Sequence, residues 1–182
     1  MIKLPQTEPK LKVNEVGLRE GFKEGFLKGF EERTRDRGLI IWGWAPQLLI
    51  LSHPSIGAFL NHCGWNSALE SLSMGIPMIT WPMFADQPYN SKLLEEHMGV
   101  AIRICEGMNS VPDEEEVKRA VTVLLVEEEG KTMRRKAQEL RKHAKMAVNK
   151  EGSSFTDLQA FVRDMQQLHQ NCIAIDFEDF EG

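Results

Sequence analysis

Apolar runs of strand length alternate with segments of helical spacing between Gly38 and Ile104, and this alternation restricts the folds open to the chain. The run Leu39–Trp42 is continuously apolar, as expected of a strand that is covered on both faces in a parallel sheet. Three further runs are predicted strands: Ile56–Leu60, Pro77–Thr80 and Ala101–Ile104. Strands that alternate with short helices indicate β-α units, so we expect an α/β fold with a parallel sheet flanked by helices.

Helices are predicted between these strands. Apolar residues recur at helical spacing from Trp65 to Leu72, and Gly75 supplies the stop. Shorter helices are expected over Pro46–Leu51 and Pro88–His97. The chain therefore returns between strands through helices, which is the connection that parallel pairing requires.

The remainder of the chain is predicted to be helical. Ser110–Asp113 forms a capping box with Pro112 at a position suited to a helix start. Ser154–Asp157 caps a last helix, in which we expect four apolar residues to face inward: Phe155, Leu158, Val162 and Met165.

The two ends of the chain differ from this central part. Glycines stand four apart from Gly17 to Gly29, and in a helix they would cost about 3–4 kcal/mol relative to alanine. We therefore expect an irregular or weakly helical lead-in over residues 1–37, with Met1–Lys12 irregular. We expect one domain over residues 38–170 and an acidic flexible tail over residues 171–182, loose from Asp176 on.

Composition excludes several classes of function. The net charge is −5 in 182 residues, which argues against a general binder of nucleic acids or anionic membranes. No apolar run reaches the length of a membrane span. The three cysteines, Cys63, Cys105 and Cys172, are far apart and odd in number, as in proteins of a reducing compartment. We expect a cytoplasmic protein with no nucleic-acid partner and no membrane span.

The polar stretch Asn61–Ser67 follows a predicted strand and opens a predicted helix. Ligands of open parallel sheets sit beyond the carboxyl ends of the strands. Gly64 allows close approach of a ligand, and the helix start behind it offers free N–H groups to an anion. We therefore predict a phosphate site here, with additional side-chain donors and, one turn along the helix, a carboxylate that accepts from hydroxyls: His62, Asn66, Ser67 and Glu70.

Each of these residues also has a structural interpretation. His62 alone is more often a satisfied, partly buried histidine, and Glu70 alone a solvated helix residue. Asn66 and Ser67 alone are equally well explained as capping residues. Asp86–Gln87 alone is a polar loop tip. A metal at His62–Cys63 is not expected, because no second Cys/His pair stands at ligand spacing.

The 44 residues from Trp44 to Gln87 read WAPQLLILSHPSIGAFLNHCGWNSALESLSMGIPMITWPMFADQ. This stretch resembles, from end to end, the signature box of the plant UDP-sugar-dependent glycosyltransferases that glycosylate small secondary metabolites. The resemblance extends over about Gly29–Gln167. It implies the C-terminal part of a two-domain GT-B fold, a partial Rossmann-like domain that holds the sugar donor.

The resemblance also implies a role for each residue of the box. Trp44 would stack on uracil, the Ala45 main chain and Gln47 would bind the uracil edge, and Glu70 would accept both ribose hydroxyls. The diphosphate would be held by His62, Asn66 and Ser67 at the helix start after Gly64. The hexose would be held by Trp65, Asp86 and Gln87. The glutamine at the end of the box, Gln87, favours UDP-glucose as the sugar donor. The donor is a co-substrate of such enzymes, and the resemblance implies no cofactor and no metal.

The resemblance has a gap as well. Such enzymes are longer, and their acceptor domain supplies the histidine base, which no position here matches. We also expect their opening strand–helix–strand segment to be absent. By family, the function is transfer of a hexose with inversion to hydroxyls of small acceptors such as flavonoids, phenolics or terpenoids. The alternative is a non-catalytic UDP-sugar-binding fragment or an inactive truncated product, and we expect this chain alone to be inactive.

Overall fold

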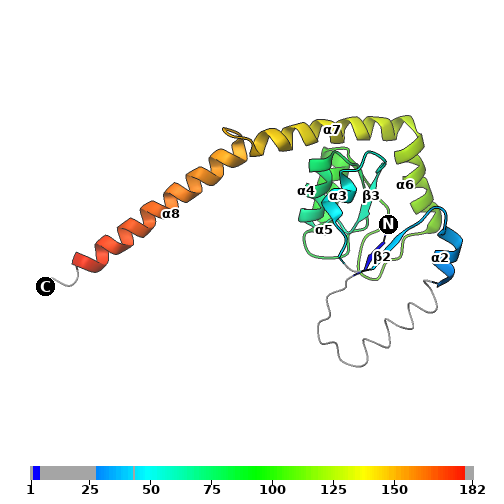
Figure 1. Cartoon of the computed structure of the whole chain (residues 1–182), viewed down its shortest axis with the longest axis horizontal. Helices are drawn as coiled ribbons and strands as arrows, with labels where there is room; N and C mark the ends of the chain where they lie inside the picture. Colours follow the sequence, from blue (N-terminus) through cyan, green and yellow to red (C-terminus); the bar gives the residue numbers. More distant parts are fainter. Residues whose placement is uncertain (1, 5–27, 43, 179–182) are drawn as a thin grey trace, which may run out of the picture. The chain divides into compact units, whose positions relative to one another are not determined.

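The computed structural model describes residues 2–4, 28–42 and 44–178 (Figure 1). The chain divides into two compact units, residues 1–49 and residues 50–182. The short helix α3 (Gln47–Leu51) contains the division.

The first unit contains a pair of parallel strands. β1 (Ile2–Leu4) pairs with β2 (Ile40–Trp42), with Ile2 opposite Ile40, and α2 (Lys28–Thr34) precedes β2. The prediction of irregular structure is therefore wrong for residues 2–4, because a run of three residues is too short to show a period and its pairing partner decides its conformation. The expected absence of the family's opening strand–helix–strand segment stays a prediction. Most of the glycine repeat lies outside the described residues.

The second unit is built on a parallel sheet of three short strands. β3 (Phe59–Asn61), β4 (Met78–Thr80) and β5 (Ala101–Arg103) pair in this order. α4 (Trp65–Met74) connects the first two strands. α5 (Gln87–Lys92), continued by the π-helical turn η2 (Leu93–His97), connects the last two. The predicted β-α units are therefore confirmed, although β3 begins three residues later than expected.

Alternate residues of the strands enter two hydrophobic clusters on opposite faces of this sheet. Met78 and Ala101 belong to the first cluster, and Ile79 and Ile102 to the second. The first cluster is completed by residues of α4, η2 and α7, among them Ala68, Leu72, Leu94 and Ala137. The second is completed by residues of α6 and the start of α7, among them Ala120, Val123, Leu124 and Met133. The central strand β4 is thus buried on both faces, as its burial along all three residues shows.

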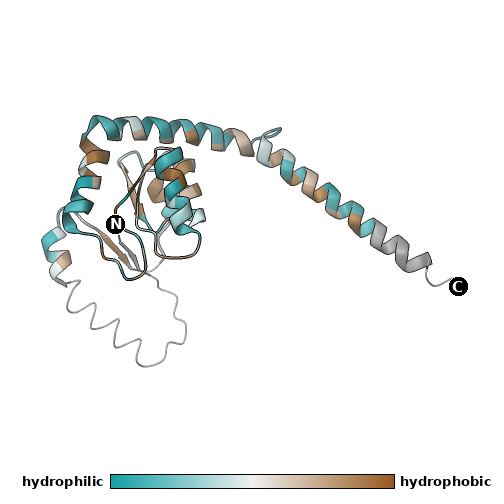
Figure 2. Cartoon of the chain, turned by 180° about the vertical axis from the view of Figure 1, so that it is seen from behind, coloured by the Kyte–Doolittle hydropathy of each residue, from teal (hydrophilic) through white to brown (hydrophobic). Residues whose placement is uncertain are grey.

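Three helices follow the sheet: α6 (Glu114–Val126), α7 (Glu128–Val148) and α8 (Ser153–Glu178). The α6 cap is Asp113 itself, whose Oδ1 accepts from the Glu115 N–H at 3.0 Å. Ser110, the expected cap, instead donates from its hydroxyl to the Gly107 carbonyl oxygen at 2.5 Å. α7 is mostly hydrophilic, with apolar residues at intervals, as the colours of Figure 2 show.

The last helix departs from its prediction. Leu158, Val162 and Met165 are exposed, so the expectation that they face inward is wrong. Helical spacing defines an apolar face, but it does not determine whether another element covers that face. α8 also continues to Glu178, where a loose tail was expected. Within the described part of the chain, no helix is long and apolar enough to cross a membrane.

Cys63 is a fully buried member of the first cluster. Burial, and secondarily the negative charge of Asp86, raises the pKa of the Cys63 thiol from 9.0 to about 11. The thiol is therefore protonated at neutral pH and is neither a nucleophile nor a metal-binding thiolate in this state.

We expect Gly130→Ala to destabilise the protein by about 1–3 kcal/mol, although alanine usually stabilises a helix relative to glycine. A Cβ at this position would lie 2.6 Å from the Leu124 carbonyl oxygen and closer still to that of Val123, and backbone cannot move aside cheaply. Urea unfolding followed by circular dichroism measures the effect. Glu129→Ala, at an exposed neighbouring position, is the matched control. A Gly130→Ala protein as stable as the parent would contradict the packing described at the α6–α7 junction.

We expect the stability of the chain to fall more steeply above pH 9 than that of Cys63→Ala. The folded-state pKa lies above the ordinary value, so the thiol contributes stability below pH 9 that is lost as the pH rises toward 11. Melting temperatures between pH 7 and pH 11 measure both slopes, with pH 7–8 as the reference range. Parallel slopes above pH 9 would show that Cys63 does not hold its proton in the folded state.

Candidate functional site

The turn from β3 into α4 leaves backbone donors exposed at a helix start. Gly64 is the N-cap of α4, and no side chain caps this helix end. The first helical hydrogen bond runs from the Ala68 N–H to the Gly64 carbonyl oxygen at 3.0 Å. The N–H groups of residues 65–67 consequently have no partner within the helix, and the helix dipole makes this end electropositive.

Cys63 holds this turn in an unusual conformation. Its φ is +63°, in the left-handed region, which costs a non-glycine residue about 1–2 kcal/mol. Two asparagine side chains hold its backbone: Asn61 Oδ1 accepts from the Cys63 N–H at 2.7 Å, and Asn90 Nδ2 donates to the Cys63 carbonyl oxygen at 3.1 Å. The turn is thus stabilised by contacts from both of its sides.

The close contact at Gly64 comes from the side chain of His62 and not from its own backbone conformation. Its φ of −62° is open to any residue, but a Cβ here would lie 2.7 Å from His62 Nε2. The His62 side chain is exposed and lies over the glycine. The absence of a side chain at position 64 therefore provides space for the imidazole, whereas sequence reasoning assigned that space to a ligand.

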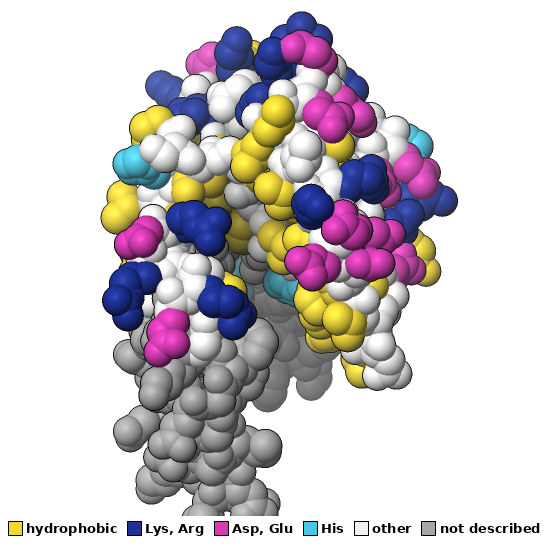
Figure 3. All heavy atoms as spheres, turned by 90° about the vertical axis from the view of Figure 1, so that its right-hand side faces the viewer, with side chains coloured by type: hydrophobic (Ala, Val, Ile, Leu, Met, Phe, Trp, Pro, Cys, Tyr) yellow, Lys and Arg dark blue, Asp and Glu magenta, His cyan; other side chains and the backbone are white. Residues whose placement is uncertain are grey.

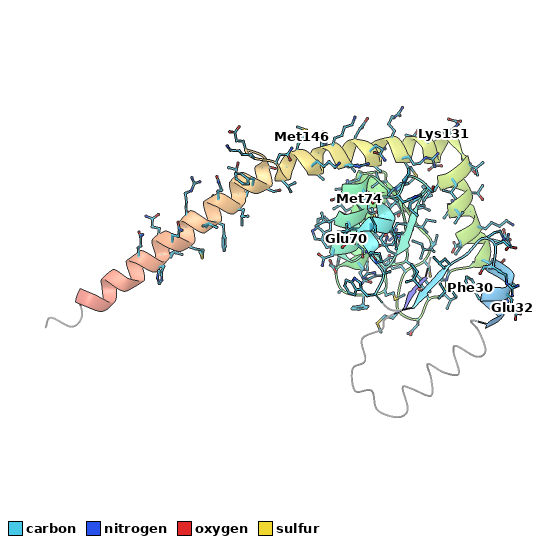
Figure 4. The ribbon with its side chains drawn as sticks, viewed as in Figure 1. Phe30, Glu32, Glu70, Met74, Lys131 and Met146 are labelled. Carbon is cyan, nitrogen blue, oxygen red and sulfur yellow. The ribbon has the colours of Figure 1, made fainter. Side chains whose placement is uncertain are left out.

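The other predicted residues of α4 lie on its first two turns. Asn66 is exposed, whereas Ser67 and Glu70 are half-buried. Asn66 and Glu70 are four residues apart and so share a face of the helix. Figure 4 labels Glu70 and the last residue of the helix, Met74. Trp65, the first residue of the helix, remains 42% exposed. The polar residues predicted to surround the anion are thus gathered at one end of α4.

The loop between β4 and α5 contains Asp86 and Gln87, which behave differently. Asp86 is exposed and caps α5 by position. Gln87 is only 5% exposed, and its Oε1 accepts from the N–H groups of Met83 (2.9 Å) and Phe84 (3.2 Å). Gln87 is therefore not a loop tip, and of its amide only the N–H donors are left for a ligand.

Three predicted residues, Trp44, Ala45 and Gln47, belong to the first unit, and the other eight belong to the second. The Trp44 side chain is 83% exposed. The Ala45 side chain is 1% exposed, so this residue can offer a ligand only its main chain. Gln47 is half-buried and is the first residue of α3.

Basic and acidic side chains are interspersed over the face drawn in Figure 3. In residues 2–4, 28–42 and 44–178, no three His, Cys, Asp or Glu side chains group as metal ligands.

Sequence reasoning missed Asn61 and Asn90. Asn61 had a local signal, because an asparagine two residues before a turn commonly accepts from the backbone two positions on. One of the two contacts of the Asn90 amide could be predicted, because Asp86 precedes Asn90 by four residues; its Oδ2 accepts from Asn90 Nδ2 at 2.7 Å. Its second partner, Cys63, is 27 residues away and leaves no pattern in the sequence.

A family profile matches this chain over residues 26–146, and its description is UDP-glucoronosyl and UDP-glucosyl transferase. UDP-glycosyltransferase 73E1 of Stevia rebaudiana is 47% identical over 148 residues, which are 75% of this chain and 30% of that protein. UDP-glycosyltransferase 73C6 of Arabidopsis thaliana is 46% identical over 152 residues, 78% of this chain and 31% of that protein. The chain thus spans about three tenths of the length of these curated relatives.

Solved structures agree. UGT73P12 of Glycyrrhiza uralensis, complexed with glycyrrhetinic acid 3-O-monoglucuronide, superposes with a TM-score of 0.75 at 33% identity, covering 85% of this chain and 34% of its own. A Polygonum tinctorium UDP-glucosyltransferase capable of glucosylating indoxyl gives 0.70 at 44% identity, covering 74% and 30%. TcCGT1, in complex with UDP, gives 0.74 at 33% identity, covering 91% and 36%.

The predicted fold class, a partial Rossmann-like α/β domain of a GT-B glycosyltransferase, is confirmed by these neighbours together with the parallel sheet and its flanking helices. With a matched profile over most of its length and relatives close to half identical in sequence, this chain belongs to the family of UDP-glucoronosyl and UDP-glucosyl transferases.

Proposed function

We propose that this chain forms the donor-binding part of a UDP-glycosyltransferase that transfers a hexose, preferably from UDP-glucose, to a hydroxyl of a small acceptor. The observation that carries the proposal is the uncapped start of α4, with the His62 imidazole placed over Gly64. A UDP complex of the related TcCGT1 and a glucosyltransferase among the neighbours support it.

The diphosphate binds at the start of α4. Backbone N–H groups of residues 65–67 and the positive end of the helix dipole favour an anion there. His62, Asn66 and Ser67 add side-chain donors beside them. Because the chain as a whole carries a net charge of −5, this local arrangement supplies the attraction.

The nucleoside is bound by an aromatic side chain that stacks on the base and by polar groups that bind the base edge and the ribose. The exposed Trp44 indole offers an aromatic face on which uracil stacks. The Ala45 main chain and Gln47 bind the edge of the base. Glu70 accepts from the ribose hydroxyls, as a carboxylate on the Asn66 face of α4.

The hexose is bound by Trp65, Asp86 and Gln87. The Asp86 carboxylate can only accept hydrogen bonds, and Gln87, whose Oε1 is engaged by Met83 and Phe84, can only donate them. A sugar hydroxyl both donates and accepts, so this pair recognises neighbouring hydroxyls by complementary roles.

Transfer with inversion needs a base that deprotonates the acceptor hydroxyl, and we assign none of the described residues to this task. His62 belongs to the diphosphate site. A second candidate function is therefore UDP-sugar binding without transfer, because the described residues supply groups for the donor and none assigned as the base. Hexose transfer from labelled UDP-glucose by the purified 182-residue chain would exclude this second function.

We place the protein in the cytoplasm, because its three cysteines are far apart in sequence and odd in number, as in proteins of a reducing compartment.

We expect UDP to raise the melting temperature of the chain, and Trp44→Ala and His62→Ala to abolish the rise. Ligands that bind only the folded state stabilise it by mass action. Scanning fluorimetry with and without UDP measures the shift, and His53→Ala, at an exposed histidine outside the site, is the matched control. EDTA should leave the shift unchanged, because histidine and backbone donors take the place of a cation. An equal shift in all variants would refute the site.

We expect Gly64→Ala to weaken UDP binding by about tenfold, the effect of losing one charge-assisted contact, without lowering stability by much. The added Cβ displaces the His62 imidazole, a movable side chain, from its place at the α4 start. Isothermal titration with UDP measures affinity and thermal melting measures stability. Cys105→Ala, at a half-buried position outside the site, serves as control. Unchanged affinity in Gly64→Ala would show that the imidazole position does not matter to UDP.

A further inference from the structure

One side chain connects the diphosphate turn with the hexose loop. The Asn90 amide donates from Nδ2 to the Cys63 carbonyl oxygen at 3.1 Å and to Asp86 Oδ2 at 2.7 Å. We propose that Asn90 is a positioning residue that sets the geometry of Asp86 and of the Cys63 turn together, so that diphosphate and hexose are bound in one register. This inference rests on the proposed function.

Both hydrogen atoms of the Asn90 amide are used. A side-chain amide nitrogen carries two donors, and the two acceptors given above account for them. Asn90 itself is fixed on α5, since its backbone N–H donates to the Asp86 carbonyl oxygen at 3.0 Å and its side chain is half-buried. The amide is therefore a rigid bridge between residues that are 23 positions apart in sequence.

At one end of the bridge lies the left-handed turn. Holding the Cys63 carbonyl oxygen fixes the plane of the peptide that joins Cys63 to Gly64, at the start of α4. Since a φ of +63° is unfavourable for cysteine, this contact counteracts relaxation of the turn toward a more common conformation. The direction of the donors around the diphosphate thus depends on Asn90.

At the other end lies the Asp86 carboxylate. Asn90 engages Oδ2, which orients the group, and the carboxylate keeps its second oxygen for a sugar hydroxyl. Gln87 stabilises the same loop from within, through Met83 and Phe84, but those contacts do not reach the β3–α4 turn. Gln87 consequently stabilises the internal conformation of the β4–α5 loop, whereas Asn90 sets the position of Asp86 relative to the Cys63 turn.

Titration of the 182-residue chain with UDP and with UDP-glucose tests this role. We expect Asn90→Ala to weaken UDP-glucose by about tenfold or more, because a hydrogen bond to a carboxylate is lost, and UDP by a clearly smaller factor. Lys92→Ala, at an exposed position of the same helix, is the matched control and should match the parent for both ligands.

Asn90→Asp supplies a readout that a purely structural role would not move. The introduced carboxyl has the same shape but donates a hydrogen bond only when protonated, and the neighbouring Asp86 charge favours protonation. UDP-glucose affinity of Asn90→Asp, relative to the parent, should therefore recover in part as the pH is lowered from 7 to 5, because the protonated carboxyl carries one donor where the amide carries two. That of Asn90→Ala should not. Thermal melting of each variant is measured first, and Asn90→Asp carries the test alone if Asn90→Ala does not fold.

The outcomes separate the inference from the function beneath it. Parental affinities for both ligands in Asn90→Ala, or equal losses for both ligands together with no pH-dependent recovery in Asn90→Asp, would overturn the positioning role while UDP binding stands. Failure of the parent chain to bind UDP would overturn the proposed function, and the role of Asn90 with it.

Discussion

The register of β3, β4 and β5 is the constraint on which the site depends. Asn61 lies opposite Thr80, and Thr80 lies opposite Arg103, so the three strands end level with one another. The polar segments that follow β3 and β4 therefore leave the sheet side by side. A slip of one residue would exchange the two faces of β4, moving Met78 and Ile79 into the wrong hydrophobic clusters. Packing of apolar side chains on the two faces of the sheet thus fixes the positions of the polar segments that follow β3 and β4.

The outer edge of β5 shows how the same sheet is finished on one side. Glu95 Oε1 accepts from the Arg103 backbone N–H at 3.0 Å, and the same carboxylate lies 3.4 Å from the Arg103 guanidinium. A side chain thereby occupies a strand donor that would otherwise be open to a further strand. The glutamate comes from η2, directly before β5, so the connecting segment itself closes this edge.

Much of this architecture could be predicted from the sequence, because the signals were local. The first two residues of β4 and of β5 are buried, and all four are apolar: Met78, Ile79, Ala101 and Ile102. Gly75 ends α4 with a φ of +71°, the conformation that favours glycine after a helix. The proposed anion site at Asn61–Ser67 rests on a strand end, a glycine and a helix start in succession, and the structure has these three features in that order.

The parts that could not be predicted depend on partners far away in the chain. The inward position of Gln87 follows from the path of the loop that it closes, and Asn90 reaches across 27 residues to Cys63. β1 is defined by its pairing with β2. On α8, helical spacing gave an apolar face, but only the packed structure shows that Leu158 and Val162 remain exposed. The spacing of apolar residues therefore predicts a helix and its apolar face, but it does not predict which other element packs on that face.

The contact between His62 and Gly64 has a consequence for how this turn can evolve. Backbone conformation at position 64 would accept any residue, so the demand for glycine originates in the ring two positions earlier. The two sites therefore form a coupled pair in sequence space. A small residue at position 62 would leave room for a side chain at position 64, whereas with the histidine in place a side chain at position 64 requires the imidazole to move.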